Sequence, residues 1–146
     1  MSDQLKQFAV AVVGAAALYF GYGKYKESKL TVRHVFLCTF KEGHPYHDKE
    51  KAQELIDATL DLKNTVGKDL AGDMVCKCGL DLGLPDTSKA KGQMSFSITA
   101  DFESGTDAYR YMPHKNHMAY AKKWISPWLA EGKNVQFNLD GSLPSS

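Results

Sequence analysis

The stretch "LTVRHVFLCTF", residues Leu30–Phe40, alternates between two sets of side chains. The even-numbered positions carry Val32, His34, Phe36, Cys38 and Phe40. The odd-numbered positions carry Thr31, Arg33, Val35, Leu37 and Thr39. Because successive side chains of a strand point to opposite faces, this pattern predicts a strand with one apolar face and one mixed face. We expect a central strand that is covered on both sides.

Three later segments alternate in the same way and predict further strands. The strictest is "QMSFSITADF", Gln93–Phe102, whose inward positions are Met94, Phe96, Ile98, Ala100 and Phe102. The second is "DMVCKCGLDLG", Asp73–Gly83, whose buried face carries Met74, Cys76, Cys78, Leu80 and Leu82. The last is "KNVQFNLD", Lys133–Asp140, which contributes Val135, Phe137 and Leu139. The cysteines of the second strand are interpreted as small buried hydrophobic residues.

Helical spacing separates these strands. After the cap residue Asp48, apolar residues recur every three or four positions until Gly67, which predicts an amphipathic helix. The order of elements is strand, helix, strand, strand, helix pair, strand. It predicts an α+β fold of the ferredoxin-like type, with one four-stranded antiparallel sheet and helices on one face. With Phe, Met and Cys at alternate positions, the open face of this sheet is too apolar for water, so we expect two copies to pair into a barrel.

The helix pair follows the strictest strand. A short helix is expected over Ser104–Tyr111, and Pro113 is expected to open a second one. Ser126 and Pro127 interrupt that second helix, and a fresh turn is expected to end near Gly132.

The N-terminus differs in kind from the rest of the chain. Residues 7–23 contain no charged side chain and are bracketed by Lys6 and Lys24. At about 1.5 Å per residue, a helix of this length reaches the short end of a membrane crossing. A removed signal peptide is the alternative, because small residues end the apolar run. We expect an uncleaved transmembrane anchor at 7–23 after a flank at 1–6, then a charged tether at 24–30, the folded domain at 31–140 and a flexible tail at 141–146.

Charges around this segment predict its orientation. Several basic residues follow it and only Lys6 precedes it, so the positive-inside rule places the domain on the cytosolic or matrix side. Small residues recur at helical spacing at Ala11, Gly14 and Gly21, a face that lets transmembrane helices of a larger complex pack closely. We expect a single-pass protein of the mitochondrial inner membrane, with the endoplasmic reticulum as the alternative.

Composition and motifs exclude several functions. The net charge is +1 and the isoelectric point is about 7.7, with no basic cluster interleaved with aromatic residues, so no nucleic-acid partner is expected. The chain has neither a glycine-rich phosphate loop nor a serine nucleophile elbow. His44 and His47 form a weak pair in a loop expected to be solvated, and neither a metal site nor a cofactor is expected.

Four segments together carry a family resemblance: "VRHVFLCTFKEG", "ADFES", "YRYMPHKNHMAY" and "NVQFNLD". They resemble the stress-responsive A/B barrel family, whose small ferredoxin-like domains pair into a dimeric α+β barrel. The resemblance covers residues 31–140. It implies a homodimer formed through the sheet face. Most members have no assigned activity, and one plant member is a polyketide cyclase that closes a linear tetraketide by an intramolecular aldol reaction.

The resemblance also implies a site. The catalytic histidine of the cyclase corresponds to His117, its partner tyrosine to Tyr111, and a further pocket histidine to His34. Two positions depart from the family pattern. Lys115 stands where the family often has proline, and strand three offers serines around Ser95 in place of another histidine.

The chemistry of these residue types is consistent with that site. An imidazole held by a phenol in an apolar pocket can accept a proton from a carbon next to a carbonyl group. The alternative is that both residues only cap and pack the helix start. Six further residues are expected to line the pocket: Phe36, Met94, Phe96, His114, Met118 and Trp124. Of these, Met94, Phe96, Met118 and Trp124 are large enough to fill it.

Two functions remain from the sequence. The first, which the anchor favours, is a non-catalytic accessory subunit that docks into a larger membrane assembly. The second is an anchored enzyme or a carrier of small apolar ligands that uses Tyr111, His117 and His34. An open pocket between the sheet and the "PHKNH" helix would favour the second function.

Overall fold

The computed structural model describes residues 29–81 and 94–139 of the chain. The expected anchor at 7–23, most of the tether and the tail at 141–146 lie outside these residues. Among the helices of the two described ranges, none combines the length and the hydropathy of a membrane-spanning segment.

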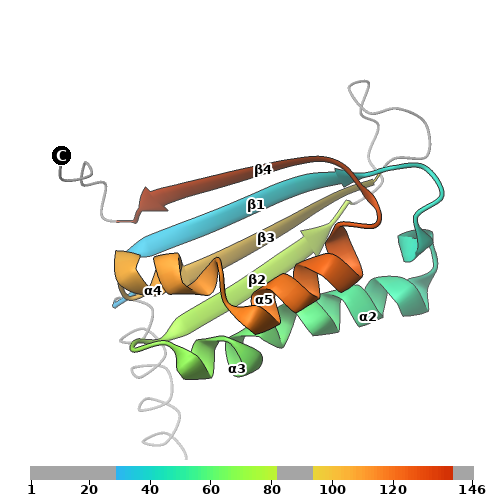
Figure 1. Ribbon diagram of the computed structural model, residues 1–146. Helices are drawn as coiled ribbons and strands as arrows, with labels where there is room; N and C mark the ends of the chain where they lie inside the picture. The colour runs from blue at the N-terminus through green and yellow to red at the C-terminus, as the bar shows by residue number, and fades with distance from the viewer. Residues whose placement is uncertain (1–28, 82–93, 140–146) are drawn as a thin grey trace, which may run out of the picture.

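The described residues form one antiparallel sheet of four strands with helices on one face (Figure 1). The strands are β1 (Val32–Phe40), β2 (Met74–Leu80), β3 (Met94–Phe102) and β4 (Leu129–Asn138). The helices are α2 (Lys49–Leu60), α3 (Leu62–Thr65), α4 (Gly105–Tyr111) and α5 (Lys115–Tyr120). Two short 3-10 turns, η1 (Pro45–His47) and η2 (Gly67–Asp69), and a π-helical turn, η3 (Ala121–Ile125), complete the set.

The strand order β2-β3-β1-β4 confirms the ferredoxin-like fold expected from the sequence. It also confirms that β1 is central, because β1 pairs with β3 on one side and with β4 on the other. His34, for example, lies opposite Ala100 of β3 and Gln136 of β4. Two ladders of hydrogen bonds therefore fix the register of β1, and a slip by one residue would turn its whole apolar face outward.

One face of the sheet packs on the helices and forms the core. The most deeply buried side chains come from β1, β3, α2, α3 and α4 and include Cys38, Phe40, Phe96, Ala100, Phe102, Leu55, Leu62 and Tyr111. All the strand residues in this set have even numbers, as the alternation predicted. Cys76 of β2 shares this buried face, and Cys78 beside it is half-buried.

The other face has a different composition from the one expected. The Phe, Met and Cys residues of β1, β2 and β3 share the even-numbered face, which meets the helices, so they do not make the open face apolar. That face carries serines and threonines and an ion pair in which Arg33 donates two hydrogen bonds of 2.7 Å to Asp101. Its apolar members include Leu37, which is 54% exposed, and Val135, which is 42% exposed. Within the part of the chain that the structure describes, then, β1 is covered on one face only.

The predicted helix cap at Asp48 is confirmed, and one helix start is corrected. The Asp48 carboxylate accepts hydrogen bonds from the backbone N–H groups of Glu50 and Lys51, and Ser104 caps α4. However, α5 begins at Lys115 rather than at Pro113. His114 is its cap, and its Nδ1 atom accepts a hydrogen bond of 3.2 Å from the N–H of Asn116.

The connection into the last strand also differs from the prediction. The helix continues into the π-helical turn, in which the N–H of Ser126 donates to the carbonyl oxygen of Ala121. β4 then starts at Leu129, so no separate turn ends near Gly132. β4 starts this early because Phe40, the last residue of β1, pairs with Leu129. The ladder between β1 and β4 therefore runs along the whole of β1.

Candidate functional site

A cavity of about 160 Å³ lies between the even-numbered face of the sheet and the helices α4 and α5. Four residues proposed from the sequence line it: His34, Phe36, Tyr111 and His117. The remaining lining residues are Ile98, Met112, Tyr120, Ala121, Ile125, Ser126, Leu129 and Asn134. Ser126, Leu129 and Asn134 are exposed, so the cavity opens toward the side of the sheet where β4 lies.

Tyr111 lies between the two histidines of this cavity. Its ring centre is 4.3 Å from that of His117 and 6.0 Å from that of His34. On the core side its ring packs against Phe102 at 5.2 Å. Burial raises the pKa of Tyr111, so the phenol stays protonated at neutral pH and can act as a hydrogen-bond donor.

The hydrogen bond of His117 selects one form of its imidazole ring. Its Nδ1 atom lies 2.8 Å from the carbonyl oxygen of Met112. A carbonyl oxygen can only accept, so the proton sits on Nδ1 and the lone pair on Nε2. Desolvation lowers the pKa of His117; the bond to Met112 opposes this shift and the nearby His114 adds to it. The ring is therefore neutral at pH 7, and no described residue bonds its basic Nε2 atom.

His34 is the most deeply buried histidine of the cavity, with 3% of its surface exposed. Its Nδ1 atom is buried and has no hydrogen-bond partner among residues 29–81 and 94–139. Burial lowers the pKa of His34, and the neighbouring His117 lowers it further. Most buried polar atoms in proteins are paired, so an unpaired ring nitrogen at a cavity wall marks a candidate binding site.

The other five residues proposed for the pocket lie elsewhere. Met118 points outward from α5 and is 56% exposed. Phe96 stacks on Phe40 in the core, and Met94 packs at the edge of that core. His114 lies 3.1 Å from a carboxylate oxygen of Asp69, and the ring of Trp124 lies under the ammonium group of Lys123.

Sequence reasoning missed most of the remaining wall. Ala121 and Tyr120 follow His117 at helical spacing, which is a signal that the sequence does contain. The hydroxyl of Tyr120 is not free, because it lies 2.6 Å from the hydroxyl of Thr59. Asn134 gives no such signal. It reaches the cavity through its register with Phe36, which depends on where β4 begins.

The histidine pair in the loop after β1 is not solvated as expected, because His44 is buried. Its Nδ1 atom accepts a hydrogen bond from the N–H of Tyr46, and its ring centre lies 4.1 Å from that of His47, with the two rings tilted by 32°. Within residues 29–81 and 94–139, no three histidine, cysteine or acidic side chains cluster closely enough to hold a metal ion.

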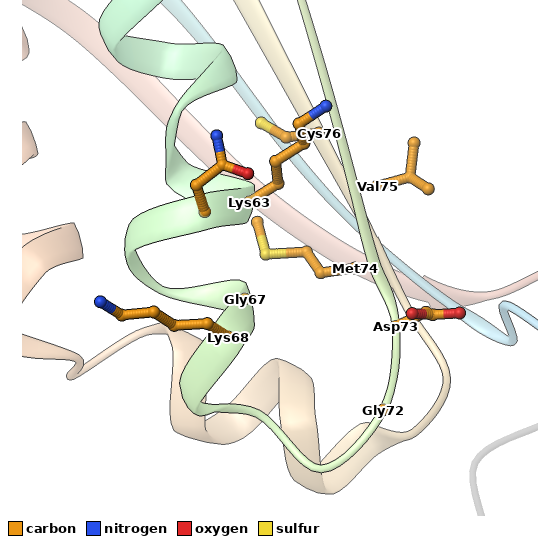
Figure 2. Close-up of a pocket in the computed structure, with 9 residues that line it drawn as sticks. Lys63, Gly67, Lys68, Gly72, Asp73, Met74, Val75 and Cys76 are labelled. Carbon is orange, nitrogen blue, oxygen red and sulfur yellow. The ribbon is translucent and has the colours of Figure 1, made fainter.

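A larger hollow of about 580 Å³ lies between α3 and the start of β2 (Figure 2). Lys63 and Met74 reach into the space between the helix and the strand, whereas Val75 points away from the helix. The one cysteine that lines it, Cys76, has its pKa raised by burial to about 12, so its thiol is not a nucleophile at neutral pH. The smaller cavity is therefore the better candidate for chemistry.

Comparison with known proteins supports the fold. The chain matches no protein-family model, and a search of curated proteins gives no match either. Among solved structures it is similar to the Arabidopsis thaliana protein At3g17210, with 23% identity over 79% of this chain and 96% of that one and a TM-score of 0.55. It is also similar to a hydroxynitrile lyase from Passiflora edulis, with 19% identity, coverage of 80% and 99% and a TM-score of 0.55.

A third similar structure is a dimeric ferredoxin-like protein of unknown function from Thermobifida fusca. It shares 24% identity over 75% of this chain and 92% of that one, with a TM-score of 0.54. At these identities the matches bear on the fold, and they agree with the ferredoxin-like α+β arrangement of the strands.

The state of the two cavity histidines can be measured by NMR of the imidazole nitrogens. We expect His117 to carry its proton on Nδ1, and both His34 and His117 to titrate below the usual value of about 6.5. A His117 that carries its proton on Nε2, or that titrates above this value, would contradict the site geometry.

The same shifts predict how stability depends on pH. An unfolded histidine takes up a proton near about pH 6.5, whereas these folded ones do so only at lower pH. Their contribution to stability is therefore complete above about pH 6.5 and is lost as the pH falls toward the folded-state pKa values. Replacement of His34 by Gln should make urea unfolding less sensitive to pH in that range.

Proposed function

We propose that the cavity binds a small uncharged carbonyl compound and that His117 removes a proton from the carbon next to the carbonyl group. The observation that carries this proposal is the hydrogen bond from Nδ1 of His117 to Met112, because it leaves a neutral ring with its basic Nε2 atom unpartnered among the described residues. A neutral imidazole of this kind is suited to general base catalysis near pH 7.

The lining of the cavity supports an uncharged ligand. None of its residues is Lys, Arg, Asp or Glu, so a charged ligand would lose its water without gaining a partner of opposite charge. The volume supports a small one, since an apolar cavity of about 150 Å³ holds a benzene molecule. We infer a ligand about the size of one ring with a single polar group.

Tyr111 and His34 complete the proposed chemistry. The Tyr111 hydroxyl makes no hydrogen bond within the described residues and can donate one to the carbonyl oxygen, where negative charge grows as the carbon loses its proton. His34 lines the same cavity and is the second polar residue proposed to face the ligand. The Passiflora edulis protein, named a hydroxynitrile lyase, is an example of an enzyme built on this fold.

Deuterium exchange tests this activity without knowledge of the natural substrate. In heavy water the protein should speed the exchange of the methyl protons of acetophenone, which NMR follows directly. Loss of a general base typically costs a factor of about 10² to 10⁴, so His117→Ala should remove most of the acceleration. Tyr111→Phe should retain part of it.

His47→Ala is the matched control, because this histidine is exposed and does not line the cavity. Its exchange rate should equal that of the unchanged protein. Equal rates for His117→Ala and the unchanged protein would show that His117 is not the base.

Pairing of two copies through the open face of the sheet is a second part of the proposal. The exposed Leu37 and Val135 support it, since a second sheet would cover them. The similar protein from Thermobifida fusca is dimeric. Analytical ultracentrifugation of the purified protein should give the mass of a pair, and Leu37→Glu should give that of one chain; a single chain in both cases would contradict this pairing.

A second candidate function is that of an accessory subunit anchored in a membrane. It is favoured by the uncharged stretch at 7–23, bracketed by Lys6 and Lys24. We propose attachment through this stretch, with the domain on the matrix side of the mitochondrial inner membrane or, as the alternative, on the cytosolic side of the endoplasmic reticulum. A catalytic cavity and an anchor are compatible, since a membrane also supplies apolar ligands.

Membrane attachment is tested by alkaline carbonate extraction of cell membranes. The full chain should stay in the pellet. The double variant Val12→Lys and Ala16→Lys should be released, because each lysine costs about 2.5 to 3.5 kcal/mol at the centre of a membrane helix. Ser142→Lys with Ser145→Lys adds the same charge outside the segment and should stay in the pellet. Release of the unchanged chain would contradict the anchor.

A further inference from the structure

Phe36 differs from its neighbours on β1, because it forms part of the cavity wall. Cys38 and Phe40, on the same face of the strand, are fully buried core residues, whereas Phe36 is half-buried and lines the cavity. In the sheet it lies opposite Ile98 of β3 and Asn134 of β4, and both of these also line the cavity. This three-residue row therefore forms the floor of the cavity.

The ring of Phe36 rests against a glycine of β4. A Cβ atom added to Gly132 would lie 3.0 Å from Cε2 and 3.2 Å from Cζ of Phe36, and 3.3 Å from Cδ1 of Leu129. Carbon atoms in ordinary contact are about 3.5 to 4.0 Å apart. Only glycine at position 132 leaves room for the ring in its present place.

We propose that Phe36, seated against Gly132, sets the upper limit on the size of the ligand that enters this cavity. The inference rests on the function proposed above and adds the class of ligand: uncharged compounds with a single small ring or a branched chain of similar volume. Two-ring compounds are excluded because the Phe36 ring occupies the space that a second ring needs. The limit depends on both residues.

Substitutions at Phe36 and at Gly132 should change the size of the cavity in opposite directions. Phe36→Ala removes the ring and extends the cavity toward Gly132 and Leu129. Gly132→Ala adds a methyl group behind the ring, and the ring then has to move. Cavity space is free on its other side, so the ring moves inward and the cavity shrinks.

Binding of two ketones of different size tests this assignment. The probes are acetophenone, with one ring, and 2-acetonaphthone, with two, and the dissociation constants come from ligand-observed NMR titrations. The unchanged protein should prefer the one-ring ketone. Because a single methylene group changes selectivity by about tenfold or more, Phe36→Ala should shift the preference toward the two-ring ketone by at least about tenfold. Gly132→Ala should weaken acetophenone binding, because the ring has to give way into the cavity.

Matched variants separate this effect from a general loss of packing. Tyr109→Ala removes an exposed aromatic side chain of α4, and Gly105→Ala adds a Cβ atom that meets nothing within 4 Å. Neither should change the preference between the two ketones. If Phe36→Ala does not fold, as judged by circular dichroism, then Phe36→Leu and Gly132→Ala decide the question.

The outcomes distinguish this inference from the function on which it rests. If the unchanged protein binds neither ketone, both the proposed function and the size limit are overturned. If it binds acetophenone and the preference is the same in the Phe36 and Gly132 variants, the size limit alone is overturned. Opposite changes in the two variants support both.

Discussion

The pairing of β1 on both of its edges is the constraint on which the fold and the site depend. Because β3 and β4 hold it in register, its even-numbered side chains all face the helices. This single constraint buries Phe40 in the core and places His34 and Phe36 at the wall of the cavity. The polar residue His34 and the proposed size-limiting residue Phe36 thus lie on the face of β1 that packs on the core.

Burial also determines the chemistry available in the cavity. Desolvation disfavours the charged form of a histidine, so it keeps His34 and His117 neutral, and the carbonyl group of Met112 fixes which nitrogen of His117 is basic. The cost is an unpaired nitrogen on His34. A bound ligand that hydrogen-bonds to this nitrogen would offset part of the free-energy cost of burying it unpaired.

Much of the fold could be predicted from the sequence because alternation and capping are local signals. The strands, the Asp48 cap and the short helix near Ser104 follow from such signals, and the position of Tyr111, His117 and His34 at one cavity follows from the family resemblance. The rest depends on non-local geometry. His114 caps α5, the π-helical turn changes the helical phase, and β4 begins at its contact with Phe40. Consequently Met118 points outward, and Asn134 lines the cavity without a sequence signal.

The central claim is that a small ketone binds between Tyr111 and His117. Intermolecular nuclear Overhauser effects between acetophenone and the purified protein test it most directly. The account predicts contacts from the methyl group of the ketone to the His117 ring and from its aromatic protons to Phe36. Contacts confined to Met118 or to Lys63 at the larger hollow, or no contacts at all, would contradict it.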